Sequence, residues 1–183
     1  NQGWDPVTAE AVLRDVACFG VEFCEQPVAY WDYAAMRRLR EVSPVPVMAD
    51  ESLFDHHDAL RLASQGACHY MNIKLSKAGG LYHALQIVSV AEAAGIHCMV
   101  GCMSETRLGL SAAAHLVSAR KQIIYADLDG AADLVDDPVV GGMTYDAGRI
   151  ELPDAPGHGA DVRLEVLQRL QGAVVYAPVA DEA

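Results

Sequence analysis

The sequence is short of basic residues. Its 183 residues contain 13 Lys and Arg against 25 Asp and Glu, which gives a formal net charge of −12 at pH 7. A protein that binds nucleic acid or an anionic membrane surface needs clustered positive charge to attract phosphate groups. The composition therefore argues against nucleic acid and against a membrane surface as partners.

Long hydrophobic runs and paired cysteine motifs are also lacking. The longest largely apolar stretches, such as 84–91, are far shorter than the roughly 20 residues of a membrane-spanning helix, and the printed residues contain no signal-peptide pattern. The five cysteines show neither a CxxC motif nor a Cys/His spacing typical of zinc sites. Most lie in or beside predicted buried strands, where a reduced thiol behaves as a small hydrophobic group. We therefore expect a cytoplasmic protein with reduced cysteines.

Short apolar segments alternate with amphipathic segments along the chain. Predicted strands begin near Val21, Val45, Cys68, Ile96 and Ile123, about 25 residues apart, which is the length of one βα unit. The apolar residues between them have helical spacing. We predict helices from 6 to a stop at Gly20, over 33–41, over 56–65 with Leu60, Leu62 and Ala63 facing inward, over 81–94 and over 108–119.

Five consecutive units of one kind favour a repetitive parallel α/β architecture. A (β/α)₈ barrel needs eight strands and typically about 250 residues, so this chain is either a doubly wound open sheet or the later part of a barrel. From Ala131 the pattern changes to a loop over 136–142, a short strand over 150–152 and a last helix over 161–170. We divide the chain into a barrel part, 1–159, and a terminal helix and tail, 160–183, that packs on the barrel or on a further domain.

Charged residues follow the predicted strands where each strand ends. A parallel strand buried on both faces has no place for a charge except at its ends, and the carboxyl ends of such strands carry the chemistry of α/β folds. We therefore predict that Asp50 and Lys74, on adjacent strands, are neighbours over one site. The residues at these ends are Glu25, Asp50, Glu51, Lys74, Ser104, Glu105, Asp127 and Asp129.

Most of these side chains are acidic, and like charges repel at short distance unless a cation lies between them. Oxygen ligands without neighbouring Cys or His indicate a hard divalent ion, Mg²⁺ before Zn²⁺. Lys74 beside such a cation would have a depressed pKa, which suits a general base. The alternative is that single acids cap the following helices, but caps do not explain all five strand ends together.

Three segments resemble the enolase superfamily, and within it the muconate-lactonizing subgroup: Glu25-Gln26-Pro27, Ala49-Asp50-Glu51-Ser52 and Asn72-Ile73-Lys74-Leu75-Ser76-Lys77-Ala78-Gly79-Gly80. The spacing of the motifs fits as well, and the resemblance runs from Asn1 to about Gly159. It implies the later part of an enolase-superfamily (β/α)₈ barrel. The first strands and an N-terminal capping domain of that family would precede the chain shown.

The resemblance also implies roles for individual residues. Glu25 and Asp50 would be two of three Mg²⁺ ligands, and the third is expected before the first residue of the chain. Lys74 would exchange the proton α to the substrate carboxylate on one face, and a lysine further upstream would serve the other face. Glu51 would orient or tune the lysine side of the site, and Lys77 would be structural or adjacent to the substrate.

The segment Asp127-Leu128-Asp129 resembles the Asp-x-Asp motif of dipeptide epimerases of the L-Ala-D/L-Glu epimerase type. In those enzymes the two acids receive the α-ammonium group of the dipeptide, and two alternating carboxylates at a strand end can both approach one cation. Ser104 and Glu105 resemble the preceding strand end of the same enzymes and would also contact the substrate. The alternative is that Asp127 and Asp129 are a helix cap and a turn residue.

As a whole, the resemblance implies Mg²⁺-dependent epimerisation of a dipeptide by proton transfer at the carbon α to its carboxylate, through an enediolate. The enzymatic alternatives are an N-acylamino acid racemase, an o-succinylbenzoate synthase and a muconate-type cycloisomerase. The non-enzymatic alternative is an inactive barrel-derived interaction module. The sequence leaves the preferred dipeptide open, and also whether the protein forms a homo-oligomer, as family members often do.

Overall fold

Five parallel strands form the central sheet of the protein. The computed structural model describes residues 1–171, and in it the strands are hydrogen-bonded in the order β1-β2-β3-β4-β5. Each strand pairs with the strand that follows it in sequence, as in a (β/α) barrel, whereas a doubly wound sheet reverses its order. The strands are β1 (Cys24–Glu25), β2 (Val47–Ala49), β3 (Tyr70–Lys74), β4 (His97–Gly101) and β5 (Ile123–Ala126).

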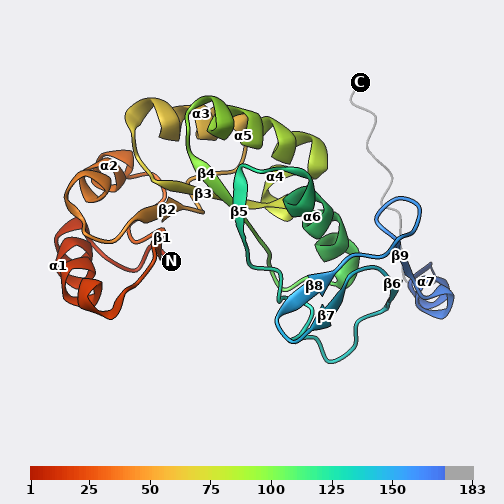
Figure 1. Cartoon of the computed structure of the whole chain (residues 1–183). Helices are drawn as coiled ribbons and strands as arrows, with labels where there is room; N and C mark the ends of the chain where they lie inside the picture. The colour runs from red at the N-terminus through yellow and green to blue at the C-terminus, as the bar shows by residue number, and fades with distance from the viewer. Residues whose placement is uncertain (172–183) are drawn as a thin grey trace, which may run out of the picture.

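Helices connect consecutive strands and cover one side of the sheet. Helices α2, α3 and α5 lie together on that side, and α6 lies next to β5 (Figure 1). The predicted helices are confirmed, with ends shifted by a few residues, and no described helix is long and apolar enough to cross a membrane. The short helix α4 (Leu75–Ala78) was not predicted. The other described helices are α1 (Pro6–Val16), the 3₁₀ helix η1 (Ala17–Phe19), α2 (Tyr33–Val42), α3 (His56–Gln65), α5 (Leu81–Ala93), α6 (Arg107–Ala119) and α7 (Leu164–Gln171).

Helix α3 shows why the chain folds locally as it does. The Asp55 side chain accepts hydrogen bonds from the amides of His57 (2.8 Å) and Asp58 (3.0 Å), so two N–H groups without helical partners are satisfied. Gly66 ends the helix with φ of 61°, a conformation that glycine adopts without a steric penalty. Ala59 and Leu62 share the buried face. The predicted inward position of Leu60 is wrong, because it lies off the face that residues 59, 62 and 63 define.

The strands present two different faces. Met71 and Ile73 of β3 belong to the hydrophobic core that includes the buried residues of α3 and α5. The alternating residue Tyr70 faces the other way, where its ring packs 5.7 Å from Tyr125 and 6.0 Å from Phe23. These three aromatic residues lie on or just before β1, β3 and β5. Barrel interiors are filled by layers from alternate strands in this manner, so this aromatic face corresponds to a barrel interior.

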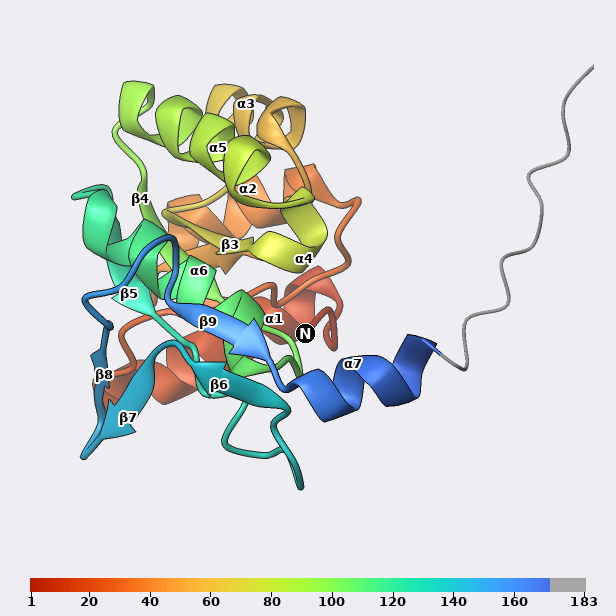
Figure 2. The ribbon, with the colours of Figure 1, turned by 90° about the vertical axis from the view of Figure 1, so that its right-hand side faces the viewer.

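Beyond β5 the chain forms two small antiparallel sheets. Strand β6 (Val139–Gly141) pairs with β9 (Ala160–Val162), and β7 (Thr144–Asp146) pairs with β8 (Arg149–Glu151). The predicted strand over 150–152 is thus confirmed with a shift of one residue. Figure 2 shows α7 extending from the end of β9, away from the central sheet.

The predicted loop over 136–142 is wrong, because it contains β6, and strand β9 was not predicted. The helix predicted over 161–170 is confirmed as α7, but it begins only at Leu164 because Asp161 and Val162 belong to β9. The reason is tertiary. Arg107 at the start of α6 donates hydrogen bonds to the carbonyls of Val139 (2.8 Å) and Gly141 (3.0 Å) and pairs with Asp137. The predicted boundary at residue 159 stays a prediction, and the tail over 172–183 lies outside the described residues.

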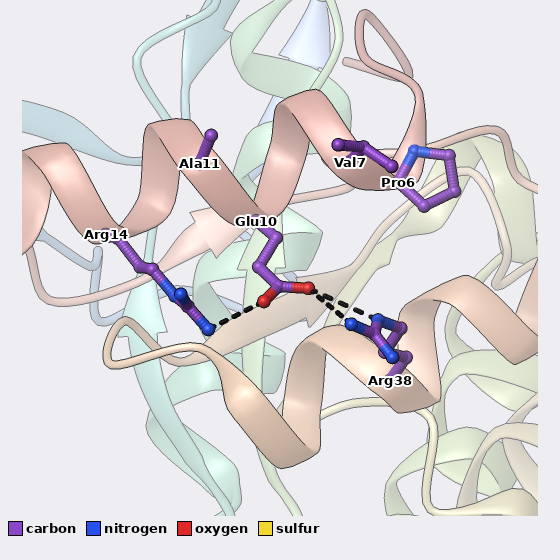
Figure 3. Close-up of a pocket in the computed structure, with 6 residues that line it drawn as sticks. All are labelled: Pro6, Val7, Glu10, Ala11, Arg14 and Arg38. Atoms are coloured by element: carbon purple, nitrogen blue, oxygen red, sulfur yellow. Dashed lines mark hydrogen bonds and ion pairs between the residues drawn. The ribbon is translucent and has the colours of Figure 1, made fainter.

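Helices α1 and α2 are joined by an ion-pair network (Figure 3). Glu10 accepts hydrogen bonds from Arg14 at 2.7 Å and from two nitrogens of Arg38 at 3.0 and 3.2 Å. Both arginine side chains are largely exposed, and pairs of this kind typically contribute about 0–1 kcal/mol. The network therefore orients the two helices, while the buried core supplies the stability.

Two leucines on α3 test the assignment of the core. Leu62 is fully buried and Leu60 is 59% exposed. We expect Leu62→Ala to lower the free energy of unfolding by about 2–5 kcal/mol, because it leaves a cavity between helix and sheet. The matched variant Leu60→Ala should change it by less than about 0.5 kcal/mol. Urea denaturation followed by circular dichroism measures both, and equal effects would contradict the orientation of α3.

Candidate active site

Three adjacent strands bring three charged side chains to one edge of the sheet. Glu25 is the last residue of β1, Asp50 directly follows β2, and Lys74 is the last residue of β3. Because the strands are parallel and in register, their carboxyl ends lie side by side. Lys74 Nζ donates a hydrogen bond of 2.8 Å to Asp50 Oδ2. The prediction that Asp50 and Lys74 are neighbours from adjacent strands is confirmed.

Asp50 is the most buried of these groups, with 2% of its surface exposed. A second lysine, Lys77 of α4, donates to both its carboxylate and its main-chain carbonyl. Burial by itself would raise the pKa of Asp50, but the charges and hydrogen bonds of Lys77 and Lys74 outweigh burial and hold the pKa below its usual value. The carboxylate therefore stays ionised. Lys77 belongs to the site as a buried counter-ion of Asp50.

Burial acts in the same direction on the two lysines, but their net pKa shifts are opposite. It lowers the pKa of both ammonium groups, and at Lys77 it prevails over the attraction of Asp50, so that this pKa lies below its usual value. At Lys74 the hydrogen bond and the charge of Asp50 outweigh burial and raise the pKa. We predicted a depressed pKa for Lys74 beside a cation. The protein groups alone raise this pKa, so a depression would have to come from the cation.

Glu25 is held by a residue to which the motifs assigned no role. Asn72 Nδ2 donates a hydrogen bond of 2.8 Å to Glu25 Oε1 across strand β2. The Asn72 side chain lies over Gly101 of β4, where an added Cβ would come within 2.7 Å of Asn72 Oδ1. Burial raises the pKa of Glu25, and the neighbouring carboxyl group of Asp50 raises it further. A polar residue inside the buried segment of β3 was the available sequence signal for Asn72.

The residues at this edge fit a magnesium ion. Glu25 and Asp50 offer oxygen ligands, which hard divalent cations prefer, and a cation would relieve the repulsion between the two carboxyl groups. Asn72 Oδ1 and Glu51 Oε2 are buried oxygens that have no hydrogen-bond partner among the described residues. Within residues 1–171, no group of three or more His, Cys, Asp and Glu side chains is placed to hold a metal. The chain thus contributes two candidate ligands, and the third, upstream ligand stays a prediction.

The Asp-x-Asp segment continues the edge beyond β5. The amide of Asp127 donates a hydrogen bond of 2.9 Å to the carbonyl of Val100, which extends the pairing with β4 by one residue. Leu128 is buried, and its carbonyl accepts a hydrogen bond of 2.6 Å from the Tyr145 hydroxyl. Asp127 and Asp129 are exposed on either side of it. The alternation of the backbone therefore directs both carboxylates away from the core.

Asp127 is close enough to Lys74 for the two side chains to interact electrostatically. Burial and the charge of Asp129 raise its pKa, whereas the charge of Lys74 lowers it. No helix begins at this point of the described chain, so the alternative that Asp127 caps a helix is wrong. Asp129 does open a turn, in which its carbonyl accepts a hydrogen bond of 2.7 Å from the amide of Ala132.

The other predicted substrate-binding residues lie around this edge. Glu105 Oε1 accepts a hydrogen bond of 3.1 Å from the amide of Met103, within the loop between β4 and α6, and Ser104 is exposed on that loop. The negative charge of Glu51 favours the ammonium forms of Lys74 and Lys77, although at Lys77 burial prevails and the pKa still lies below its usual value. The structure places these residues near the site, and their contacts with a substrate stay predictions.

Two surface hollows of the described part of the chain lie away from this cluster. A hollow of about 380 Å³ lies beside Glu10 between α1 and α2 (Figure 3), and one of about 420 Å³ lies along β6 and β9. Neither is lined by Glu25, Asp50 or Lys74. The candidate active site is therefore identified by its chemistry and not by the size of a cavity.

Consecutive parallel βα units with charged groups at the strand ends define the chain as part of a (β/α)₈-type barrel. Comparison with known proteins then identifies the family. Residues 1–166 match the family described as Enolase C-terminal domain-like. The chain belongs to this family, which confirms the resemblance noted in the sequence.

Its relatives include enzymes that are named for dipeptides. The chain is 42% identical over 163 residues to the L-Ala-D/L-Glu epimerase of Clostridium acetobutylicum, covering 88% of this chain and 46% of that protein. It is 43% identical over 161 residues to the hydrophobic dipeptide epimerase of Enterococcus faecalis, covering 87% of this chain and 46% of that protein. The chain spans about half the length of the curated relatives it matches.

Solved structures show the same similarity. The dipeptide epimerase of Cytophaga hutchinsonii, complexed with Mg and the dipeptide D-Ala-L-Val, superposes with a TM-score of 0.89 at 39% identity. The match covers 92% of this chain and 46% of that one. The likeness extends over almost the whole chain.

Lys77 provides a test of the electrostatics of the site. Lys77→Met removes the donor to the Asp50 carbonyl and one of two cations at its carboxylate, while Lys74 remains. We expect a loss of about 1–3 kcal/mol in the free energy of unfolding, measured by urea denaturation without added metal. The exposed Lys121→Met variant serves as control and should lose less than about 0.5 kcal/mol. Equal stability of the two variants would contradict the buried pairing of Lys77.

Proposed function

We propose that the protein to which this chain belongs is a Mg²⁺-dependent dipeptide epimerase. The observation that carries the proposal is the meeting of Glu25, Asp50 and Lys74 at one sheet edge, with the Asp127–Asp129 pair on the same edge. Relatives named as dipeptide epimerases, and a structural neighbour complexed with Mg and a dipeptide, support it. The reaction would invert the carbon α to the carboxylate of the dipeptide.

Glu25 and Asp50 would hold the magnesium ion. When bound, the ion would supply positive charge at the substrate carboxylate, where negative charge develops as the α-proton leaves. Asn72 keeps one oxygen of Glu25 in place through its 2.8 Å hydrogen bond. Lys77 holds the Asp50 backbone and carboxylate. These two residues would limit the movement of the carboxylates while the substrate binds.

Lys74 would move the proton. Its amine lies at the end of β3 and is already within the polar cluster, so a substrate carboxylate held near Asp50 would bring its α-carbon close to Nζ. The unprotonated amine would take the α-proton on one face, and a base on the part of the protein that precedes this chain would return a proton on the other face. The product would differ from the substrate only in the configuration at this carbon.

Asp127 and Asp129 would receive the α-ammonium group of the dipeptide. Burial and the charge of Asp129 raise the pKa of Asp127, so an ammonium group bound beside the two carboxylates would be stabilised. N-acylamino acid racemases, o-succinylbenzoate synthases and muconate-type cycloisomerases act on substrates that have no ammonium group there. The paired acids therefore favour a dipeptide over those substrates. They also argue against an inactive interaction module, which would not need a pair of carboxylates at this position.

The Lys74→Ala variant of the full-length enzyme tests the proton transfer. Incubation of each diastereomer of a dipeptide in D₂O with Mg²⁺ should show exchange of the α-proton for one diastereomer and none for the other, because one of two opposed bases is gone. Proton NMR of the α-position measures both exchange rates, with the wild-type enzyme as reference. Wild-type exchange rates for both diastereomers would exclude Lys74 as the base.

The Asp127→Asn variant tests the substrate class. Loss of one charge-assisted contact with the ammonium group should lower kcat/KM for a dipeptide about 10- to 100-fold, and should change little for an N-acylated analogue. Asp133→Asn is the matched control, since Asp133 is exposed on the loop that follows. A greater loss with the acylated analogue than with the dipeptide would favour the racemase alternative.

A further inference from the structure

Gln26 is a fully buried polar residue that directly follows the candidate ligand Glu25. Its side-chain oxygen accepts hydrogen bonds from the main-chain amides of Asp50 at 3.0 Å and Ser52 at 3.1 Å. Its side-chain nitrogen donates to the carbonyl of Val28 at 3.1 Å. The oxygen thus has both of its acceptor positions filled by the turn that carries the second candidate ligand.

The main chain of Gln26 has an unusual conformation. Its φ of +34° lies in the region that residues with a Cβ atom rarely adopt. Its amide nevertheless donates to the carbonyl of Met48 at 2.9 Å, so the pairing of β1 with β2 continues through this residue. A conformation that costs free energy persists where surrounding contacts stabilise it, and such residues cluster at functional sites.

The backbone pairing of β1 with β2 includes the candidate ligand Glu25 but ends before the candidate ligand Asp50. In the register of β1 with β2, Glu25 lies opposite Met48, whereas Asp50 lies two residues further on, beyond the end of β2. Lys77 holds the carbonyl and carboxylate of Asp50 from α4, but the two carboxyl groups repel each other, so the turn also needs an attachment to the strand that carries Glu25. The two hydrogen bonds to the Gln26 side chain provide that attachment.

We propose that Gln26 is a positioning residue that preforms the two-carboxylate site. By accepting hydrogen bonds from the amides of Asp50 and Ser52, it takes the place of the strand ladder beyond β2. It thereby fixes Asp50 relative to Glu25 before a cation binds. The inference rests on the proposed function only in assigning the two carboxylates to a divalent cation, and it does not depend on which substrate is epimerised.

Hydrogen exchange in the wild-type, full-length protein tests the preformed site without a mutation. With metal removed by chelation, the amides of Asp50 and Ser52 should exchange slowly, as amides within β3 do, because the Gln26 oxygen satisfies them. Addition of Mg²⁺ should then slow their exchange little further. Exchange at the rate of an unprotected chain without metal, followed by protection on adding Mg²⁺, would overturn the proposal, since the cation would then organise the turn.

The Gln26→Met variant separates positioning from general stability. Its side chain is similar in length but cannot accept the two hydrogen bonds, so the amides of Asp50 and Ser52 should exchange faster than in the wild type. The affinity for Mg²⁺, measured by calorimetric titration without substrate, should fall about 10- to 100-fold, as for other residues that orient metal ligands.

Gln122→Met is the matched control for this variant. Gln122 also donates its side-chain amide to a carbonyl, that of Ile96 at 2.6 Å, but it lies before β5 at the opposite end of the strands. The control should lose stability and retain the wild-type affinity for Mg²⁺. Equal Mg²⁺ affinities for Gln26→Met and Gln122→Met would overturn the proposal. If Gln26→Met does not fold, the exchange measurement on the wild type decides.

The outcome can be separated from that of the proposed function. A protein that binds Mg²⁺ through a preformed Glu25–Asp50 pair but epimerises no dipeptide would refute the proposed function and leave the role of Gln26 intact. An active epimerase whose metal-free Asp50 and Ser52 amides are unprotected would refute only the role of Gln26.

Discussion

The structure depends on the placement of like charges at the carboxyl ends of buried parallel strands. Glu25 and Asp50 cannot lie inside the sheet, because an ionised carboxylate in an apolar interior is too costly, and at the edge they repel each other. Two lysines compensate Asp50, and an amide side chain holds Glu25. The charges, hydrogen bonds and backbone turns at this edge all serve to keep two carboxylates together.

The two faces of the central sheet have different roles. One face packs against α2, α3 and α5 and supplies the hydrophobic core. The other face carries the aromatic layer of Phe23, Tyr70 and Tyr125. On this second face, Glu25 and Asn72 lie two residues further along β1 and β3. A rigid scaffold thus lies directly beneath the polar groups. Sites on regular elements hold their geometry more closely than sites on loops, which suits a cluster in which small shifts change the charge balance.

Local patterns predicted the elements where local physics decides them. The Asp55 cap, the Gly66 stop and the apolar spacing of α3 act within a few residues, and the structure confirms them. The same reasoning failed for Leu60, which follows the buried Ala59 but is exposed. It also failed for β6 and β9, which pair with each other across an intervening segment, with β6 hydrogen-bonded to Arg107. The strand pairing joins residues 19 to 23 positions apart, and the Arg107 contacts span 32 and 34 positions, so no short window of sequence contains them.

The sequence by itself determined the repeating βα units, the family, and the kinds of charged residue at each strand end, because these follow from periodicity and from motifs read along the chain. Only the tertiary structure decided that Asn72 donates a hydrogen bond to Glu25 and that Lys77 is buried against Asp50. It also decided that the Gln26 side chain links the end of β1 to the turn after β2. Asn72 and Glu25 are 47 positions apart, and Gln26 and Asp50 are 24 apart. Whether such residues touch depends on strand register and helix packing, which the whole fold sets.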